Sequence, residues 1–405
     1  MIKRFSLYAL TSLVCAVIGF FITIYLTRHL SPSDFGYIGI YGILIYVLNP
    51  LMTFNSSGLV SINIINYTKN EYRNFIDSFI SLFIIIASIL LVSVLIVGYV
   101  LPKYWVVIIA SLIISFLTIL LNIHYIELVQ EKKVKVYSKM KLYFTITTSL
   151  LTLILVGLLK MAWEGRLLSI IFASFLVCLL MYKTTFSSLK NYSWNFDKNQ
   201  IKSILNFGYP LVIGIGAAWI ITQADKYIVL KYFDLESLGY YSLAYIIGMK
   251  ITILNTSMVN AISPQVFTAL KNKIAKNILR KYSLLYNLFL IIFTFCAIIF
   301  FKYFGIKIIG KTFSNSIPII MLILIAGGFD GAYRVHGLVI EYFKETKLKT
   351  IIAYIIAGIN ILVSILLIPK YGILAPAIGT IIAFMLNYIL TYIFALKILK
   401  RNMIN

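Results

Sequence analysis

The sequence predicts an all-α integral membrane protein with twelve transmembrane helices arranged in two six-helix lobes. Hydrophobic residues make up 61% of the 405 residues and charged residues only 12%, whereas soluble domains average about 45–50% and about 25%. Twelve apolar stretches approach the roughly 20 residues that a helix needs to cross a bilayer. A weak internal repeat about 200 residues apart indicates two copies of one bundle. This composition excludes soluble classes, including nucleic-acid-binding proteins, despite a net charge of +23.

The expected spans follow one another with short connections. The first apolar stretch follows Lys3 and Arg4, as in a signal peptide, but its length and its lack of an Ala-x-Ala-like end favour a retained span. The sixth stretch is short. In chain order the predicted spans are 5–26, 37–58, 75–100, 104–130, 142–159, 167–182, 203–229, 239–262, 283–301, 315–340, 350–368 and 373–396.

Basic residues set the predicted orientation, because Lys and Arg accumulate in cytoplasmic loops. With the N-terminus inside, most of the 36 Lys and Arg residues fall in inner segments, as in the stretch 132–141. Lys302, Lys307 and Lys311 go against this trend in one outer loop. The pattern predicts that both termini are cytoplasmic.

A polar stretch divides the chain into two lobes. The expected lobes are 1–183 and 203–405, joined by a cytoplasmic linker at 184–202. Because each lobe has an even number of spans, both enter the membrane in the same sense, and the repeat axis runs along the membrane normal. The short outer loops leave no room for an external catalytic domain.

The internal repeat consists of LTRHLSPSDFGYIGIY at 26–41 and VLKYFDLESLGYYSLA at 229–244. Aligning Gly36 with Gly239 also places Ser31 on Asp234. Each copy ends one apolar segment, passes through a short polar loop and begins another. Duplicated sets of spans are typical of transporters built around a central path, so transport is the leading functional hypothesis.

Three segments resemble polysaccharide-exporting flippases of the Wzx or O-antigen type. They are TQADKYIVLKYFDLESLGYYSLAYIIG at 222–248, YLTRHLSPSDFGYIGIY at 25–41, and INILVSILLIPKYGILAPAIGTIIA at 359–383. The last contains Asn360, Pro369, Gly372, Ala377 and Thr380 in a pattern similar to the family's. The resemblance extends over nearly the whole chain, and its motifs agree in order and spacing.

This resemblance implies a multidrug-exporter-like fold with a basic central cavity in a multi-pass protein of the bacterial inner membrane. The implied substrate is an O-antigen, capsule or related lipopolysaccharide repeat unit on polyprenyl pyrophosphate, moved from the inner to the outer leaflet. A glycan polymerase and a chain-length protein are the implied protein partners. No nucleic acid and no bound cofactor is expected, apart from H⁺ or Na⁺ as a coupling ion.

Ionisable residues inside spans are costly and usually face a bundle interior or a hydrated cavity. Lys250, Asp330 and Arg334 are the clearest examples here. We expect Lys250 and Arg334 to bind the pyrophosphate, since Arg makes paired, charge-assisted bonds to phosphate. Asp330 is a candidate carrier of a coupling ion. Asp330 and Arg334 are also four residues apart on one helical face, so a purely structural ion pair is the alternative.

Other charges lie near the predicted span ends. Asp225 and Lys226 end the seventh span, where side chains can snorkel to the interface, and Arg28 ends the first span in the same way. Asp77 and Glu127, with His124, lie toward the cytoplasmic ends of the third and fourth spans. They could bind headgroups or a cation, but a solvated interface is the favoured interpretation.

Two other function classes compete with the flippase hypothesis. A multidrug or cation antiporter shares the implied fold but needs buried acidic residues, and the first two predicted spans contain no Asp or Glu. A flippase for a lipid-linked peptidoglycan precursor would tend to be longer. A membrane glycan polymerase or glycosyltransferase would need catalytic acids or external loops. The sequence shows no catalytic set, metal-ligand spacing or nucleotide-binding motif, so enzyme activity is not expected.

Overall fold

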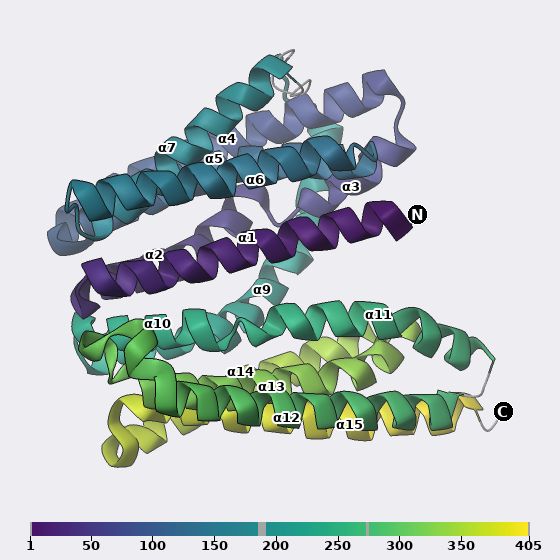
Figure 1. Cartoon of the computed structure of the whole chain (residues 1–405). Coiled ribbons are helices and arrows are strands. Elements are labelled where there is room, and N and C mark those ends of the chain that lie inside the picture. Colours follow the sequence, from purple (N-terminus) through teal and green to yellow (C-terminus); the bar gives the residue numbers. More distant parts are fainter. Residues whose placement is uncertain (1, 185–191, 273–274, 404–405) are drawn as a thin grey trace. The chain divides into compact units, whose positions relative to one another are not determined.

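The computed structural model describes residues 2–184, 192–272 and 275–403, and all regular structure in these ranges is helical. The chain divides into two compact units, Met1–Ile215 and Gly216–Asn405. Figure 1 traces the helices from the purple N-terminal end to the yellow C-terminal end. The described ranges confirm the all-α class that the sequence predicted.

The first unit is built around α5. Its helices are α1 (Ile2–His29), α2 (Pro32–Thr53), α3 (Ser57–Asn66), α4 (Lys69–Val100), α5 (Trp105–Gln130), α6 (Val134–Thr152), α7 (Trp163–Thr184) and the first part of α9 (Lys198–Tyr232). A 3₁₀ turn, η1 (Pro102–Tyr104), precedes α5, and α6 continues into the π-helical segment η2 (Leu153–Leu158). Helix α5 contacts α2, α3, α4, α6 and α7.

The second unit is built around α13 in the same way. It contains the rest of α9 and then α10 (Leu235–Gly248), α11 (Ile251–Lys271), α12 (Ala275–Ile309), α13 (Ser316–Tyr342), α14 (Thr346–Tyr371) and α15 (Ala375–Met403). The short turns η3 (Lys311–Phe313) and η4 (Gly372–Leu374) precede α13 and α15. Helix α13 contacts α10, α11, α12, α14 and α15. The two units therefore repeat one packing pattern, as the internal duplication predicted.

The repeat extends to the N-terminal caps of α2 and α10, which are equivalent helices in the two units. Ser31 caps α2: its hydroxyl accepts the N–H of Asp34 at 3.2 Å, while the Asp34 carboxylate accepts the N–H of Ser31 at 2.9 Å. Asp234, the aligned residue, caps α10 by accepting the N–H of Ser237 at 2.7 Å. That hydrogen bond favours the charged carboxylate and lowers the pKa of Asp234.

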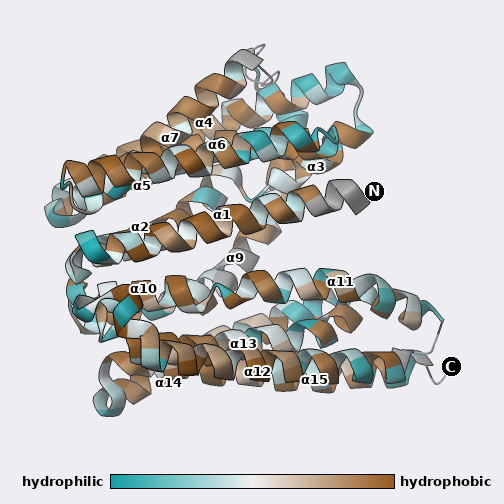
Figure 2. Ribbon diagram, in the orientation of Figure 1, coloured by the Kyte–Doolittle hydropathy of each residue, from teal (hydrophilic) through white to brown (hydrophobic). Residues whose placement is uncertain are grey.

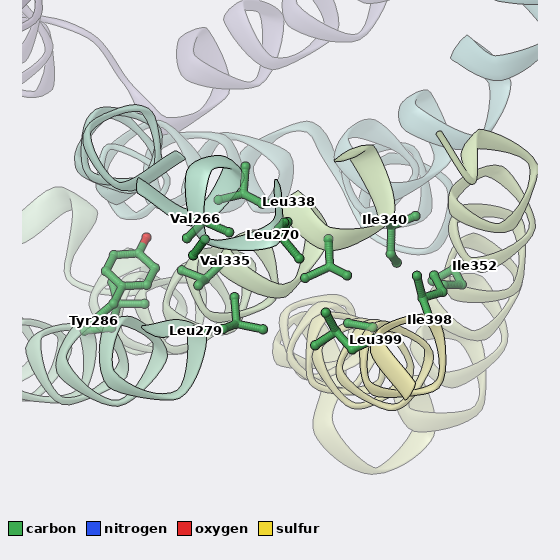
Figure 3. Packing of buried hydrophobic residues seen from close by; sticks show 14 of the residues in the cluster. Val266, Leu270, Leu279, Tyr286, Val335, Leu338, Ile340, Ile352, Ile398 and Leu399 are labelled. Atoms are coloured by element: carbon green, nitrogen blue, oxygen red, sulfur yellow. The ribbon is translucent and has the colours of Figure 1, made fainter. Parts of the chain in front are cut away.

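Apolar side chains fill the interior and also cover much of the surface. In the second unit, Figure 3 shows Val266, Leu270, Leu279, Val335 and Leu338 packed in one cluster from three helices. Figure 2 shows apolar colour along most of each helix and polar colour at many helix ends. Large exposed apolar areas are rare on soluble proteins, so these helix faces indicate contact with lipid.

Within the described ranges, ten segments are long and apolar enough to cross a membrane. The last of them, Lys347–Asn402, contains both α14 and α15, and α9 is not among the ten. Each predicted span overlaps a helix, and two of them correspond to the broken pairs α2–α3 and α10–α11. The predicted sixth span was too short: α7 has 22 residues and begins at Trp163, whose ring stacks on Tyr37 at 4.4 Å.

The boundary between the units differs from the predicted linker at 184–202. Residues 185–191 lie outside the described ranges, and α9 begins at Lys198, before the predicted linker ends. The first part of α9 packs within the first unit, where the Ser56 hydroxyl donates to the carbonyl of Ile204 at 3.1 Å. These contacts place the division between Ile215 and Gly216, inside a continuous helix.

Candidate functional site

Lys250 lies at a break in a membrane helix pair. Helix α10 ends at Gly248 and α11 begins at Ile251, so Lys250 lies in the turn between them, and Figure 1 shows the two helices end to end. Its side chain is half-buried, and its ammonium makes no hydrogen bond or ion pair within residues 2–184, 192–272 and 275–403. Non-helical backbone at membrane depth is tolerated where it is buried in protein or lines a hydrated cavity.

Arg334 forms an ion pair with Asp330 on α13. Its Nη2 lies 2.8 Å from Asp330 Oδ2 and 3.1 Å from Oδ1, and its Nε also donates to Oδ2 at 3.1 Å. The Asp330 side chain is 7% exposed and that of Arg334 is 29% exposed. Asn255 Nδ2 approaches Asp330 Oδ2 at 3.5 Å, and Asn255 accepts from the buried Tyr286 hydroxyl at 3.2 Å. The alternative weighed from the sequence, an i,i+4 pair, is therefore present.

Asp225 is the centre of a buried polar cluster in the second unit. Its carboxylate is fully buried and accepts hydrogen bonds from the hydroxyls of Tyr241 on α10, at 2.9 Å, and Thr380 on α15. Asn360 on α14 lies close enough to interact with it. Asp225 Oδ1 and Asn360 Nδ2 nonetheless have no hydrogen-bond partner among the described residues. Carboxylate, hydroxyl and amide oxygens are the ligands that hard cations prefer.

Lys226 is also buried, which corrects the expectation that this pair snorkels to the interface. Its ammonium donates to Gln223 Oε1 at 3.0 Å and lies 4.8 Å from the centre of the Tyr245 ring. Lys226 is 6% exposed and Gln223 is 7% exposed. Snorkelling fails here because neighbouring helices cover this end of α9, which the position of a charge relative to a span end does not reveal.

Asp77 in the first unit is buried as well, and the expectation of a solvated interface is wrong for it. Its side chain is 4% exposed and lies 2.9 Å from Arg73 Nε. The hydroxyl of Ser193, which lies within the predicted linker, donates to Asp77 at 2.9 Å. Asn74 donates to Asp197 at 2.9 Å, and this bond, with the N–H groups at the start of α9, lowers the pKa of Asp197. Residues 192–197 therefore cover this part of α4.

Glu127 and His124 form a second buried group on α5, so the solvated interpretation is wrong for them too. Glu127 is 4% exposed, and its carboxylate accepts from the Tyr72 hydroxyl at 2.9 Å. His124 Nδ1 lies 3.1 Å from the other carboxylate oxygen. Arg28, by contrast, is exposed at the end of α1, as expected.

The structure brings some of the predicted residues together and leaves others apart. Asp330 and Arg334 meet directly, whereas no described contact joins Lys250 to Arg334. In the described part of the chain, no group of three or more His, Cys, Asp or Glu residues could hold a metal ion. The buried carboxylate of Asp225 is instead surrounded by hydroxyl and amide groups, an arrangement suited to binding a proton or a single monovalent cation.

Comparison with known proteins identifies the family. The sequence model of the family described as "Polysaccharide biosynthesis protein" matches residues 25–318, well over half of the chain. The chain belongs to this polysaccharide biosynthesis family. "Lsg locus putative protein 1" of Haemophilus influenzae is 23% identical to it over 276 residues, which make up 67% of each chain.

Solved structures show the fold of this family member. A structure titled "Lipid II flippase MurJ, inward closed conformation" has a TM-score of 0.77 and 16% identity, covering 98% of this chain and 91% of that one. An inward-facing multidrug resistance MATE transporter of the MOP superfamily has a TM-score of 0.74 and 11% identity, covering 97% and 98%. This polysaccharide biosynthesis protein therefore shares the fold of these two membrane proteins.

One further partly buried cation in this polysaccharide biosynthesis protein was not expected from the sequence. Arg166 on α7, which falls in the outer loop between the predicted spans 142–159 and 167–182, is half-buried and donates to the Thr152 hydroxyl at 2.8 Å. No acidic residue pairs with it within the described ranges. Its position, directly before the short apolar stretch 167–182, was the available signal.

Proposed function

We propose that this protein translocates a polyprenyl-pyrophosphate-linked oligosaccharide from the inner to the outer leaflet by alternating access through a basic cavity. The glycan would be an O-antigen, capsule or related repeat unit. The observation that carries the proposal is membership of a polysaccharide biosynthesis family combined with a fold like that of the lipid II flippase MurJ. A sugar headgroup cannot cross hydrocarbon at useful rates alone, because its polar groups would lose their hydrogen bonds.

Lys250 and Arg334 are the residues that we propose bind the pyrophosphate. Lys250 has an ammonium without a described anionic partner at a helix break, which supports a role in binding an anion. Arg334 forms an ion pair with Asp330, but 29% of its side chain remains exposed and can contact a further anion. In this mechanism the incoming phosphate competes with Asp330 for the guanidinium.

The coupling ion is better assigned to Asp225 than to Asp330. Asp330 is neutralised by Arg334 at 2.8 Å. Asp225 has an oxygen without a hydrogen-bond partner in the described ranges, and oxygen-bearing side chains of three other segments surround it. We assign H⁺ or Na⁺ binding to Asp225 as part of the proposal.

The topology belongs to the same proposal. Twelve spans with both termini cytoplasmic fit the distribution of Lys and Arg, and the location would be the bacterial inner membrane. Single cysteines replacing Lys132 and Lys370 test it with a membrane-impermeant maleimide in intact cells. Labelling at position 370 alone is expected, and labelling at position 132 would overturn the orientation.

A multidrug antiporter is the second candidate function, supported by the likeness to MATE transporters. The lack of Asp and Glu in the first two predicted spans no longer separates the two functions. Asp77, Glu127, Asp225 and Asp330 are all buried, so carboxylates able to hold a coupling ion are present in both units. The nature of the substrate must decide between them.

The deciding experiment measures which leaflet holds the lipid-linked oligosaccharide in cells that lack the protein. Cells re-expressing the wild type, Lys250→Ala or Lys231→Ala are compared, Lys231 being an exposed control. Accumulation in the inner leaflet that the wild type and the control relieve, but Lys250→Ala does not, supports the proposal. Normal outer-leaflet glycan without the protein, together with increased sensitivity to cationic drugs, would favour the antiporter.

A further inference from the structure

A polar pocket of about 410 Å³ lies within the first unit. The end of α2, the break between α2 and α3, the second half of α5 and the beginning of α6 form its walls. Its volume falls in the range of small-molecule sites, about 300–1,000 Å³. The expected site residues of the protein lie elsewhere, so this pocket needs its own explanation.

Side-chain amides and hydroxyl groups supply most of the polar groups in the pocket walls. Asn49, Asn55, Asn122 and Gln130 all line it, and several hydroxyl groups lie beside them. An amide carries both donors and an acceptor, as do the neighbouring hydroxyl groups of a sugar ring. None of the described lining residues is acidic, so a cationic drug would find no opposite charge. The walls therefore match a sugar better than an organic cation.

Two polar atoms in these walls have no partner. The Oδ1 atom of Asn49 and the hydroxyl of Tyr125 are buried, and neither makes a hydrogen bond with any described residue. Buried polar groups are almost always paired, and each exception calls for an explanation such as a bound molecule. A sugar hydroxyl has the donor that Asn49 Oδ1 lacks and the acceptor that the Tyr125 hydroxyl lacks, so small rotations of these two side chains toward the pocket would pair both.

Aromatic rings and one lysine complete the pocket. Tyr125 and Tyr137 pack edge to face with centres 5.4 Å apart. Lys141 donates to the Tyr137 hydroxyl at 3.2 Å and lies 5.8 Å from the centre of the Tyr125 ring. Tyrosine combines apolar ring surface with a hydrogen-bonding tip, which suits the mixed surface of a sugar. Lys141 adds a positive charge that an acidic sugar would pair with.

The backbone at the pocket is held in an unusual conformation. Phe54 and Asn55 have φ angles of 47° and 50°, and they interrupt the helix between α2 and α3. The Ser56 hydroxyl donates toward the carbonyls of Phe54 and Ile204, each at 3.1 Å, and fixes this break. Left-handed non-glycine residues concentrate at functional sites, and irregular backbone at membrane depth is tolerated where it lines a cavity.

We infer that this pocket binds a sugar unit of the oligosaccharide through Asn49, Asn122, Tyr125 and Lys141. The inference rests on the proposed function only for the lipid to which the sugar is attached. The pocket adjoins the Lys-rich turn at 131–133, which is cytoplasmic in the predicted topology. The first unit would thus hold the glycan before it crosses the membrane.

Binding of lipid-free sugars to the purified full-length protein in nanodiscs tests this inference. The probes are the glycan released by mild acid from the cell's lipid-linked pool, maltotriose, triacetylchitotriose and inorganic pyrophosphate. Asn122→Ala is expected to weaken sugar binding about fivefold, the loss expected for one hydrogen bond. Asn70→Ala is the matched control, because Asn70 is another exposed helical asparagine that lies outside the pocket.

The Tyr125→Phe variant distinguishes a sugar-binding role of the Tyr125 hydroxyl from a purely structural role. It removes a buried hydroxyl that is unpaired without ligand, so the empty protein should unfold at a higher temperature while sugar binding weakens. Tyr143→Phe, at an exposed tyrosine of α6, should change neither. The inference is overturned if no sugar binds to the wild type. It is also overturned if Asn122→Ala and Tyr125→Phe both bind sugar as tightly as the wild type does. Loss of pyrophosphate binding alone in Asn122→Ala also overturns it, since the pocket would then take the phosphate.

The binding experiment and the leaflet experiment fail independently. Sugar binding that depends on Asn122, combined with normal outer-leaflet glycan in cells without the protein, would uphold the pocket and reject the flippase. Export that depends on the protein, with no sugar binding, would uphold the flippase and reject the pocket.

Discussion

Removing the charge of Arg334 separates its structural role from its proposed role in transport. The Asp330 carboxylate is 7% exposed and receives its short hydrogen bonds from Arg334, at 2.8 to 3.1 Å. The other described donor to it, Asn255, is 3.5 Å away. In Arg334→Gln the Asp330 carboxylate remains buried but loses its positive partner and its short hydrogen bonds. Breaking a buried pair costs about 3–5 kcal/mol, and the 29% exposure of Arg334 places this case near the lower end, about 3 kcal/mol.

The double variant Asp330→Asn/Arg334→Gln removes both charges together. Replacing a whole buried pair by neutral groups is often close to neutral for stability, so we expect its free energy of unfolding within about 1 kcal/mol of the wild type. Thermal unfolding of the detergent-purified proteins measures stability, and the leaflet assay in cells measures export. Both variants should lose export, whereas only Arg334→Gln should unfold at a lower temperature.

Two results would refute this reasoning. Export restored in the double variant would show that Arg334 serves only to neutralise Asp330. An unchanged unfolding temperature in Arg334→Gln would show that water or another group satisfies Asp330, contrary to its burial. The exposed pair of Lys349 and Glu341, which is 2.5 Å apart, is the control. Lys349→Gln should change stability by less than about 1 kcal/mol.

Three further predictions concern other parts of the molecule. Asp225→Asn should fold but lose the dependence of export on Na⁺ or pH in proteoliposomes, and a dependence equal to the wild type would place coupling elsewhere. Gly379→Ala should lower stability by about 1–3 kcal/mol, because the added methyl overlaps the Ser364 hydroxyl; Gly358→Ala, with open space around it, should melt as the wild type does. Hydrogen bonds lower the pKa of Asp197 in the folded protein. The stabilisation of the folded segment by the Asp197 carboxylate is therefore fully present above the ordinary pKa of about 3.9, and it is lost as the pH falls through the lowered pKa. Pepsin cleavage at 192–197 should therefore rise with acidity in the wild type and stay constant in Asp197→Ala.

The sequence by itself determined those features that depend on local chemistry and composition. A chain with 61% hydrophobic residues must place apolar side chains outside as well as inside, which specifies helices in lipid. The aligned residues Ser31 and Asp234 both cap helices, as short polar residues before apolar helices do. The i,i+4 pair of Asp330 and Arg334 was also visible, since both residues lie on one helix.

Only the tertiary structure decided which charged and polar side chains are covered. Asp225 looked like an interfacial residue, but its hydroxyl partner Thr380 lies 155 positions away in the chain. Asp77 is covered by Ser193, 116 positions away, and the sugar-sized pocket joins Asn49 to Lys141. Burial depends on which helices pack side by side, and the spacing of charges along one helix carries no information about its neighbours. The class of the protein was therefore fixed by local hydrophobicity, whereas its binding groups were created by contacts between segments far apart in sequence.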